Sequence, residues 1–356
     1  MPKILSLRDS VRRHREITAR PVSVRDLQRR LHPNPATSLT ALAIKMGPFD
    51  AVRDGFRFNN LFPITDEQAK QIRQRYRLFT DVVVGASVHV VREILGTLNV
   101  SIPIIGTVGL PDVVIDAVIG EVTTQLAGSL IDKIADLIPG RFGRCGGMAF
   151  AGYDFYLLGW PVDERLGTMP PTTGPLSDYI FGRLLDSLDL NVGTFLDWVV
   201  NLHVMPVVSG VANITLGAAV GSLGGPIGAA FGAILGSQVN VFDLGGPKMI
   251  LDRTKNEWQR IIGTLDAMSA CPIGLIYGDS ANPIDQHQIL AIDYIDNHDG
   301  TALLFVWDNN FKNQLQVLAL DFRGDELQVG NSARPLKGIF FEEYSFQRPP
   351  DILRLS

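Results

Sequence analysis

The chain contains very little cysteine. Its 356 residues include 2 cysteines, Cys145 and Cys271, which are far apart and lie in unlike local sequences. Two such residues cannot form a disulfide framework or a Cys-x-x-Cys redox pair. This scarcity of thiols fits a reducing compartment, or export without disulfides.

Several common enzyme motifs and a secretory signal are also absent. The sequence has no Gly-x-x-x-x-Gly-Lys-Ser/Thr loop, no Gly-x-Ser-x-Gly elbow and no His-Glu-x-x-His helix. Its 6 histidines are scattered without metal-ligand spacing, so we expect neither a metal nor another cofactor. Residues 1–20 lack an apolar core and a small-residue cleavage site. We therefore expect a cytoplasmic protein, or one exported without a conventional signal peptide.

Charge is distributed unevenly along the chain. Residues 1–80 carry 16 Lys and Arg against 7 Asp and Glu, whereas the remainder carries 16 against 30. We interpret residues 1–55 as a basic arm ahead of an acidic body. Such an arm is suited to contact nucleic acid or anionic lipid, or to lie on the acidic body itself. Aromatic residues are not interleaved with the basic ones, so we expect no nucleic-acid partner.

A long stretch from Trp198 to Phe242 contains no Asp, Glu, Lys or Arg. Within it, small residues recur at every fourth position over 213–239, a spacing that lets helices approach closely in a bilayer. Residues 199–241 are long enough for one membrane span, or for two short limbs hinged at 224–226. Each limb is too short to cross alone, which would give a re-entrant hairpin or a pore-forming insertion. A glycine-rich hairpin packed inside the fold, or a flap over the site, is the alternative.

Helix-start signals occur at several points in the first three quarters of the chain. Thr65 to Gln68 forms a capping box, which predicts a helix that runs to about Phe79. An apolar stripe predicts an amphipathic helix over 111–139 and consists of Val122, Leu126, Leu130, Ile134 and Leu137. Further helices are predicted after Cys145, over 175–190, over 192–203, and from a second capping box at Thr254–Glu257 to about Met268.

The pattern changes to strands near residue 272. Alternating apolar residues between turn residues predict strands over 272–277, 288–295, 301–308, 315–321 and 338–346. Helices first and an antiparallel sheet last are typical of an α+β fold. We therefore predict a helical lobe over 56–206, a glycine-rich apolar insertion over 207–250 and an antiparallel β lobe over 251–356.

Cys145 occupies a position suited to a nucleophile. It lies between a Pro-Gly turn at 139–140 and the apolar run 149–151, so we place it in the first turn of a helix. A helix N-terminus favours the thiolate, which is the reactive form of cysteine. We expect the following Gly146 and Gly147 to leave the sulfur uncrowded for an approaching carbonyl group.

A histidine and an aspartate are predicted to meet on the β lobe. The hairpin turn 296–299 joins two strands, and if Ile295 pairs with Gly300, His287 lies directly opposite Asp308. Residues opposite one another on one face have Cβ atoms about 4.5–5.5 Å apart. At that distance the carboxylate orients the imidazole, as in a nucleophile–base–orienter triad. A change of register would move the pair apart.

The residues around these positions resemble the papain-like cysteine peptidases, and more closely a little-characterised branch of that fold. The likeness covers roughly 55–62, 139–190 and 254–345. Its segments here are Arg144-Cys145-Gly146-Gly147-Met148, then Pro175-Leu176 with Tyr179, Arg183 and Asp186-Ser187, then His287-Gln288-Ile289-Leu290-Ala291. The resemblance implies a papain-like fold, with Cys145 on a helical lobe and His287 and Asp308 on a β lobe.

Two departures from the family pattern concern the site. The branch has Tyr-Asp-Pro-Asn where this chain has the run 307–310, Trp-Asp-Asn-Asn, which keeps the acid but changes the turn. The glutamine that papain-like enzymes place before the cysteine, as an oxyanion donor, is missing. The backbone N–H of Cys145 is one candidate donor, and Asn59 or Asn60 is a candidate for the second.

These features predict a cysteine hydrolase or acyltransferase with a Cys145–His287–Asp308 triad. Peptide or isopeptide bonds are the expected substrates, and amides and thioesters are further candidates. Membrane association through 213–239 is compatible with this function. Two alternatives stay open: a membrane-inserting effector or toxin, and a non-catalytic binding protein on a papain-like scaffold.

Overall fold

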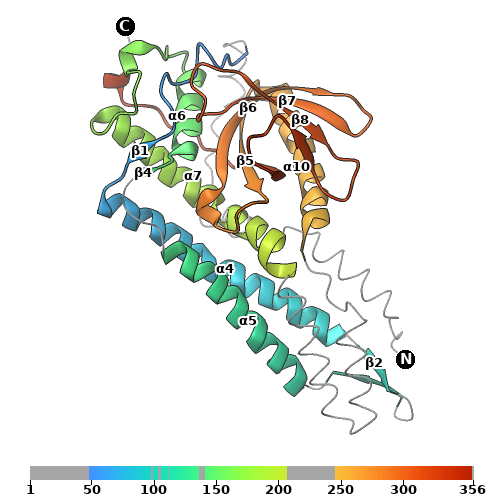
Figure 1. Cartoon of the computed structure of the whole chain (residues 1–356). Helices are drawn as coiled ribbons and strands as arrows, with labels where there is room; N and C mark the ends of the chain where they lie inside the picture. The colour runs from blue at the N-terminus through green and yellow to red at the C-terminus, as the bar shows by residue number, and fades with distance from the viewer. Residues whose placement is uncertain are drawn as a thin grey trace.

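The structure is a computed structural model that describes residues 48–97, 99–102, 106–110, 112–135, 141–206 and 245–354 (Figure 1). It has an α+β fold, with helices first and a curled antiparallel sheet of six strands packed against helices. The predicted α+β class and the order of helices before strands are confirmed.

The helical part begins with two long antiparallel helices, α4 (Asp66–Thr97) and α5 (Asp112–Ala135), which extend away from the sheet (Figure 1). The capping box that opens α4 is present, because Thr65 N–H donates to Gln68 Oε1 at 3.1 Å and Gln68 N–H donates to Thr65 Oγ1 at 3.2 Å. The helix continues well past Phe79 because its apolar face goes on packing, with Val91 and Leu95 fully buried.

Short strands connect these helices to their neighbours. β2 (Asn99–Ile102) and β3 (Gly106–Gly109) pair between α4 and α5. β1 (Phe62–Pro63) pairs with β4 (Arg141–Phe142), just before the helix that carries Cys145. Of the stripe predicted for 111–139, Val122 is buried, and the other four positions lie outside the residues whose side chains the structure describes.

Two further helices form the centre of the molecule. α6 (Cys145–Leu157) is buried at every position after its first residue. α7 (Pro175–Val199) continues into the π-helical segment η2 (Val200–Val204), so the two helices predicted over 175–190 and 192–203 are one. The chain has no proline or helix-ending glycine between those two ranges, and buried apolar residues continue across the junction.

The second predicted capping box does not start a helix. α10 runs from Pro247 to Met268, and Pro247 itself occupies the first turn, where a missing N–H costs nothing. Thr254 lies inside the helix, where its hydroxyl donates to the Ile250 carbonyl at 2.8 Å and accepts from Ile339 N–H at 3.3 Å. The boundary predicted at 250/251 therefore falls within this helix.

The sheet contains β5 (Cys271–Tyr277), β6 (His287–Asp296), β7 (Thr301–Trp307), β8 (Gln316–Asp321), β9 (Gln328–Gly330) and β10 (Leu336–Phe341). All neighbours are antiparallel in the order β10-β5-β6-β7-β8-β9. Four strands match the predicted ranges to within one residue at each end, whereas β10, predicted over 338–346, begins two residues earlier and ends five residues earlier. β9 was not predicted, because its three residues are too short to show alternation.

Helix α6 packs directly against the sheet. Trp307, the last residue of β7, is fully buried, and a Cβ atom built on Gly152 of α6 would lie 2.6 Å from its ring. Only glycine permits this approach. The contact holds the helix that begins at Cys145 against the strand that leads to Asp308.

Two regions singled out in the sequence lie mainly outside the described residues. Of the basic arm, residues 48–55 are described and belong to the body, since the Phe49 ring lies 5.3 Å from that of Tyr156 and 5.7 Å from that of Trp307. The predicted small-residue rows at 213–239 lie wholly outside. Among the helices that are described, none is long and apolar enough to cross a membrane.

Candidate active site

Cys145 is the first residue of α6 and is partly exposed. Arg144, the residue before this helix, makes no capping hydrogen bond with its side chain, and the first helical hydrogen bond runs from Met148 N–H to the Arg144 carbonyl at 2.8 Å. The amides of the first turn therefore have no partner within the helix and point toward its N-terminal end. Cys271, by contrast, is buried in β5, and burial raises the pKa of its thiol.

The two glycines after Cys145 have a different role from the one predicted. Both are buried, and a Cβ atom on Gly146 would lie 2.0 Å from Gln288 Oε1 and 2.2 Å from Ser187 Oγ. They do not clear space around the sulfur. Gly146 instead lets the first turn of α6 approach both β6 and α7, because any side chain there would collide with them.

His287 opens β6 and contacts Asp308 directly. Its Nε2 lies 2.8 Å from Asp308 Oδ1, and both side chains are largely buried. The register that predicted this contact is wrong, because Asp296 pairs with Ala302 and a bulge between Ala291 and Asp293 shifts the ladder. Beyond the bulge, Leu290 pairs with Trp307, which makes His287 and Asp308 diagonal neighbours across the two strands rather than opposite ones.

A tight turn after β7 fixes the Asp308 carboxylate. Oδ1 of Asp308 accepts a hydrogen bond from Asn310 N–H at 2.9 Å, and its backbone oxygen accepts one from Phe311 N–H, also at 2.9 Å. Burial opposes ionisation of this carboxyl, but the charge and hydrogen bond of His287 outweigh burial and lower its pKa.

The His287 imidazole is stabilised in its protonated form. Burial by itself would lower its pKa, but the charge of Asp308, their hydrogen bond and the hydrogen bond to Cys145 raise it to about 10. Since Nε2 faces Asp308, the other ring nitrogen, Nδ1, is left for the thiol. The structure thus brings the Cys145 thiol at the start of α6 near the His287–Asp308 pair at the end of β7.

Two asparagines that sequence reasoning did not assign also belong to this site. Asn310 places its side-chain nitrogen 3.1 Å from His287 Nε2, so it flanks the ring beside Asp308. Asn309 donates from Nδ2 to the backbone oxygens of Cys145 and Gln288, each at 3.0 Å. The run 307–310 was the available signal, because Asn310 matches the last residue of the Tyr-Asp-Pro-Asn pattern and Asn309 replaces its proline with a second amide side chain next to the acid.

The candidate oxyanion donors differ in position. Asn60 lies against the loop before Cys145, since a Cβ atom on Gly143 would be 2.9 Å from its Nδ2. Its amide also reaches Asn310 Oδ1 at 3.4 Å. Asn59 is exposed, and its Oδ1 accepts from Lys312 N–H at 3.3 Å. Of the two, the geometry favours Asn60.

Arg144 anchors the loop that presents Cys145. Its guanidinium is buried between the rings of Phe62 and Phe181, 4.7 Å and 5.2 Å from their centroids. It donates to the Ser177 backbone oxygen at 2.9 Å and to that of Pro63 at 3.1 Å. Burial lowers its pKa to about 10. One buried side chain thus joins the start of α6 to the start of α7 and to β1.

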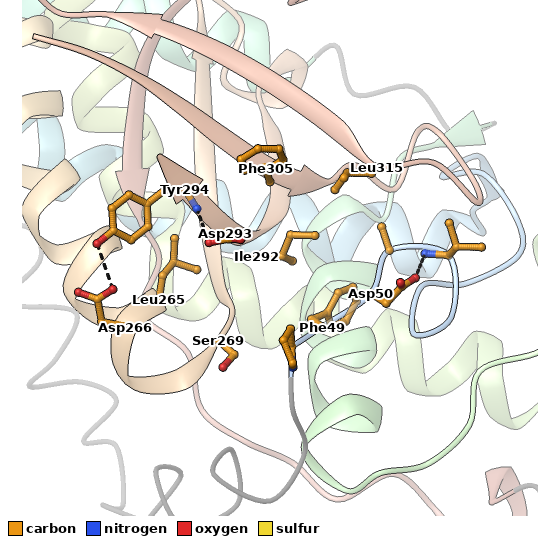
Figure 2. A pocket seen from close by; sticks show the side chains of 13 residues that line it. Phe49, Asp50, Leu265, Asp266, Ser269, Ile292, Asp293, Tyr294, Phe305 and Leu315 are labelled. Carbon is orange, nitrogen blue, oxygen red and sulfur yellow. Dashed lines mark hydrogen bonds between the residues drawn. The ribbon is translucent and has the colours of Figure 1, made fainter. Parts of the chain in front are cut away.

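A cleft of about 560 Å³ lies elsewhere, where the loop 48–52 and the end of α10 meet β6 and β7 (Figure 2). Asp266 and Asp293 face it beside apolar side chains such as Phe305. Asp293 is six residues beyond His287 on β6, which corresponds to about 20 Å along a strand. The cleft is therefore separate from the candidate triad of Cys145, His287 and Asp308.

Neither metal ligation nor similarity to known proteins adds to this picture. In the parts of the chain that the structure describes, no three His, Cys, Asp or Glu side chains are grouped so as to hold a metal ion. No family model, curated protein or solved structure matches the chain. The function is therefore argued from the geometry and chemistry of the site.

Proposed function

We propose that this chain is a papain-like cysteine hydrolase or acyltransferase that acts on peptide or other acyl substrates. The observation that carries the proposal is that His287 contacts Asp308 at 2.8 Å and lies close enough to Cys145 for the thiol to raise the pKa of the ring. Three residues of the right types, drawn from three separate elements, meet in the order that nucleophilic catalysis requires.

The reaction has two stages. The Cys145 sulfur forms a bond to the substrate carbonyl carbon, and the carbonyl oxygen becomes an oxyanion. When the oxyanion collapses, the bond to the leaving amine breaks, and His287 gives that amine its proton. His287 then takes a proton from water, whose oxygen attacks the thioester and releases the acid. A second acyl acceptor in place of water gives acyl transfer by the same steps.

Two features of the site support these steps. The raised pKa of His287 keeps the ring protonated beside the sulfur at neutral pH, which favours a thiolate–imidazolium pair. The first turn of α6 presents backbone N–H groups where the oxyanion forms, and Asn60 lies close enough to the same loop to supply a second donor.

The papain-like assignment is supported by the relation between the two lobes. The nucleophile begins a buried helix that packs on an antiparallel sheet, and His287 and Asp308 come from adjacent strands of that sheet. This is the arrangement that the resemblance of the Cys145 and His287 segments implies.

Alkylation of the native protein by iodoacetamide from pH 5 to 9, followed by peptide mass mapping, tests the proposal. Cys145 should label rapidly already near pH 6, and His287→Ala should slow it at least tenfold, because the imidazolium that stabilises the thiolate is gone. Cys271 is buried and serves as the internal control in each sample. Labelling of Cys145 no faster than an ordinary thiol, and equal in His287→Ala, would point instead to a non-catalytic binding protein.

A further inference from the structure

A second carboxyl group is buried behind the candidate triad. Glu342 follows β10 and has no exposed surface. Its backbone N–H donates to the Pro272 carbonyl at 3.1 Å, which fixes the residue beside β5. The steps proposed for Cys145, His287 and Asp308 make no use of this group.

Glu342 has one hydrogen-bonded oxygen and one without a partner. Oε1 accepts from Gln288 Nε2 at 2.6 Å, whereas Oε2 is buried and meets no donor among the described residues. A buried carboxylate needs donors for both oxygens, so this environment favours the neutral acid. Burial accordingly raises the pKa of Glu342 to about 8, although the hydrogen bond from Gln288 and the charge of His287 lower it.

Gln288 connects Glu342 to the nucleophile. This residue follows His287 on β6. Its Oε1 lies 3.3 Å from Ser187 Oγ and contacts Gly146 in the first turn of α6. Its backbone oxygen accepts from the same Asn309 amide that binds the Cys145 carbonyl. Gln288 therefore touches the start of α6 through its side chain and, by way of Asn309, through its backbone.

We propose that Glu342 is a positioning residue for the candidate triad. As a neutral acid it holds Gln288 and, through Gln288, the first turn of the helix that carries Cys145. Ionisation of Glu342 suppresses turnover. This inference rests on the proposed function. The charged form acts on His287 as well, because the acyl-enzyme needs a neutral imidazole to take a proton from water. A negative charge on Glu342, behind the ring, would instead keep the imidazole of His287 protonated.

Among the described residues, two titratable groups interact electrostatically with Glu342. His287 on β6 acts on it electrostatically and has a pKa raised to about 10. Cys271 on β5 is buried with a raised pKa, and α7 contributes the neutral Ser187 on the far side of Gln288. The neighbouring Glu343 forms an ion pair with Arg260, with Oε1 2.9 Å from Nη2.

Hydrolysis of p-nitrophenyl acetate from pH 6 to 10.5 tests the proposal, with the rate of Cys145→Ala subtracted. Wild-type turnover should fall as pH rises through about 8. Glu342→Gln cannot ionise but keeps the shape and the acceptor, so its turnover at pH 7 should stay within threefold of wild type. The fall in turnover through pH 8 should be absent in this variant. Glu342→Leu, which lacks the acceptor, should be at least tenfold slower at every pH.

The outcomes separate the two proposals. An alkaline limb that is the same in Glu342→Gln and wild type would overturn the role of Glu342, and this comparison stands even where Glu342→Leu does not fold. Turnover that requires Cys145 but is equal in Glu342→Leu and wild type would also overturn that role alone. Wild-type turnover in Cys145→Ala would overturn the proposed function, and the role of Glu342 with it.

Discussion

The side-chain amide of Asn309 donates a hydrogen bond to the backbone carbonyl of Cys145, 3.0 Å away, although 164 positions separate the two residues. The same nitrogen donates to the Gln288 carbonyl, also at 3.0 Å. One buried amide thus joins the start of α6, the start of β6 and the turn after β7. The geometry of the candidate triad depends on these two hydrogen bonds as well as on the three reactive side chains.

Asn309→Ala should remove the hydrogen bonds that connect the start of α6, the start of β6 and the turn after β7. The change leaves two carbonyl groups without their donor, so we expect a loss of about 1–3 kcal/mol in the free energy of unfolding. Alkylation of Cys145 at pH 6 should slow as well, because the thiol is no longer held against His287. Asn297→Ala, in an exposed hairpin turn, is the matched control. Equal alkylation rates in Asn309→Ala and wild type would contradict the positioning role.

The Asp308–His287 pair should stabilise the fold over a defined pH range. A raised pKa for His287 gives a contribution that is complete below its ordinary value of 6.5 and is lost as pH rises through about 10. The lowered pKa of Asp308 gives one that is present above its ordinary 3.8. Urea unfolding should therefore show the largest difference between wild type and Asp308→Asn near pH 4–6.5, shrinking toward pH 10. The exposed Asp266→Asn, measured over the same pH range, is the matched control.

Glu342 should have the opposite kind of effect on stability from an ordinary carboxylate. Its pKa is raised from 4.5 to about 8 in the folded state, so stability is complete below pH 4.5 and is lost as pH rises through 8. Glu342→Gln carries no such charge. Thermal unfolding should therefore show wild type losing stability relative to Glu342→Gln between pH 5 and 9. A constant difference over that range would show that Glu342 does not titrate there.

Gly146 should tolerate no side chain. Its Cβ position is 2.0 Å from Gln288 Oε1, so Gly146→Ala must displace β6 or α6, and we expect it to cost on the order of 1–3 kcal/mol. Gly182→Ala, in the interior of α7 with open space at its Cβ position, is the control and should stabilise the protein by about 0.5–1 kcal/mol. Denaturant unfolding of both variants distinguishes a steric effect at Gly146 from general helix propensity.

A buried ion pair next to α7 should dominate stability away from the site. The Asp154 carboxylate lies 2.7 Å from Arg183 Nε and accepts hydrogen bonds from the hydroxyls of Tyr179 and Tyr344. Asp154→Ala leaves a buried guanidinium without this partner, so we expect a loss of about 3–5 kcal/mol in urea unfolding. Asp116→Ala, which breaks an exposed pair with Arg92, should change the unfolding midpoint much less. Similar midpoints for the two variants would contradict the distinction.

Local patterns in the sequence determined the α+β class, most of the strands and the placement of Cys145 at a helix start, because alternation, turn residues and capping are properties of short segments. They also identified His287 and Asp308 as partners, since adjacent strands bring their ends together. The register could not be predicted from these patterns, because no local signal marks the bulge between Ala291 and Asp293, which turned the expected directly opposite pair into a diagonal one.

Only the tertiary structure decided what surrounds the candidate triad. Gln288, Asn309 and Glu342 lie far apart in sequence from the residues they support, and their roles depend on burial and on hydrogen bonds that no local pattern encodes. The glycines after Cys145 show the same limit: the sequence marks a place without side chains, but the fold determines which neighbours occupy that space. A segment's own residues decide its local shape, whereas the partners of a buried polar group depend on the whole packing of the chain.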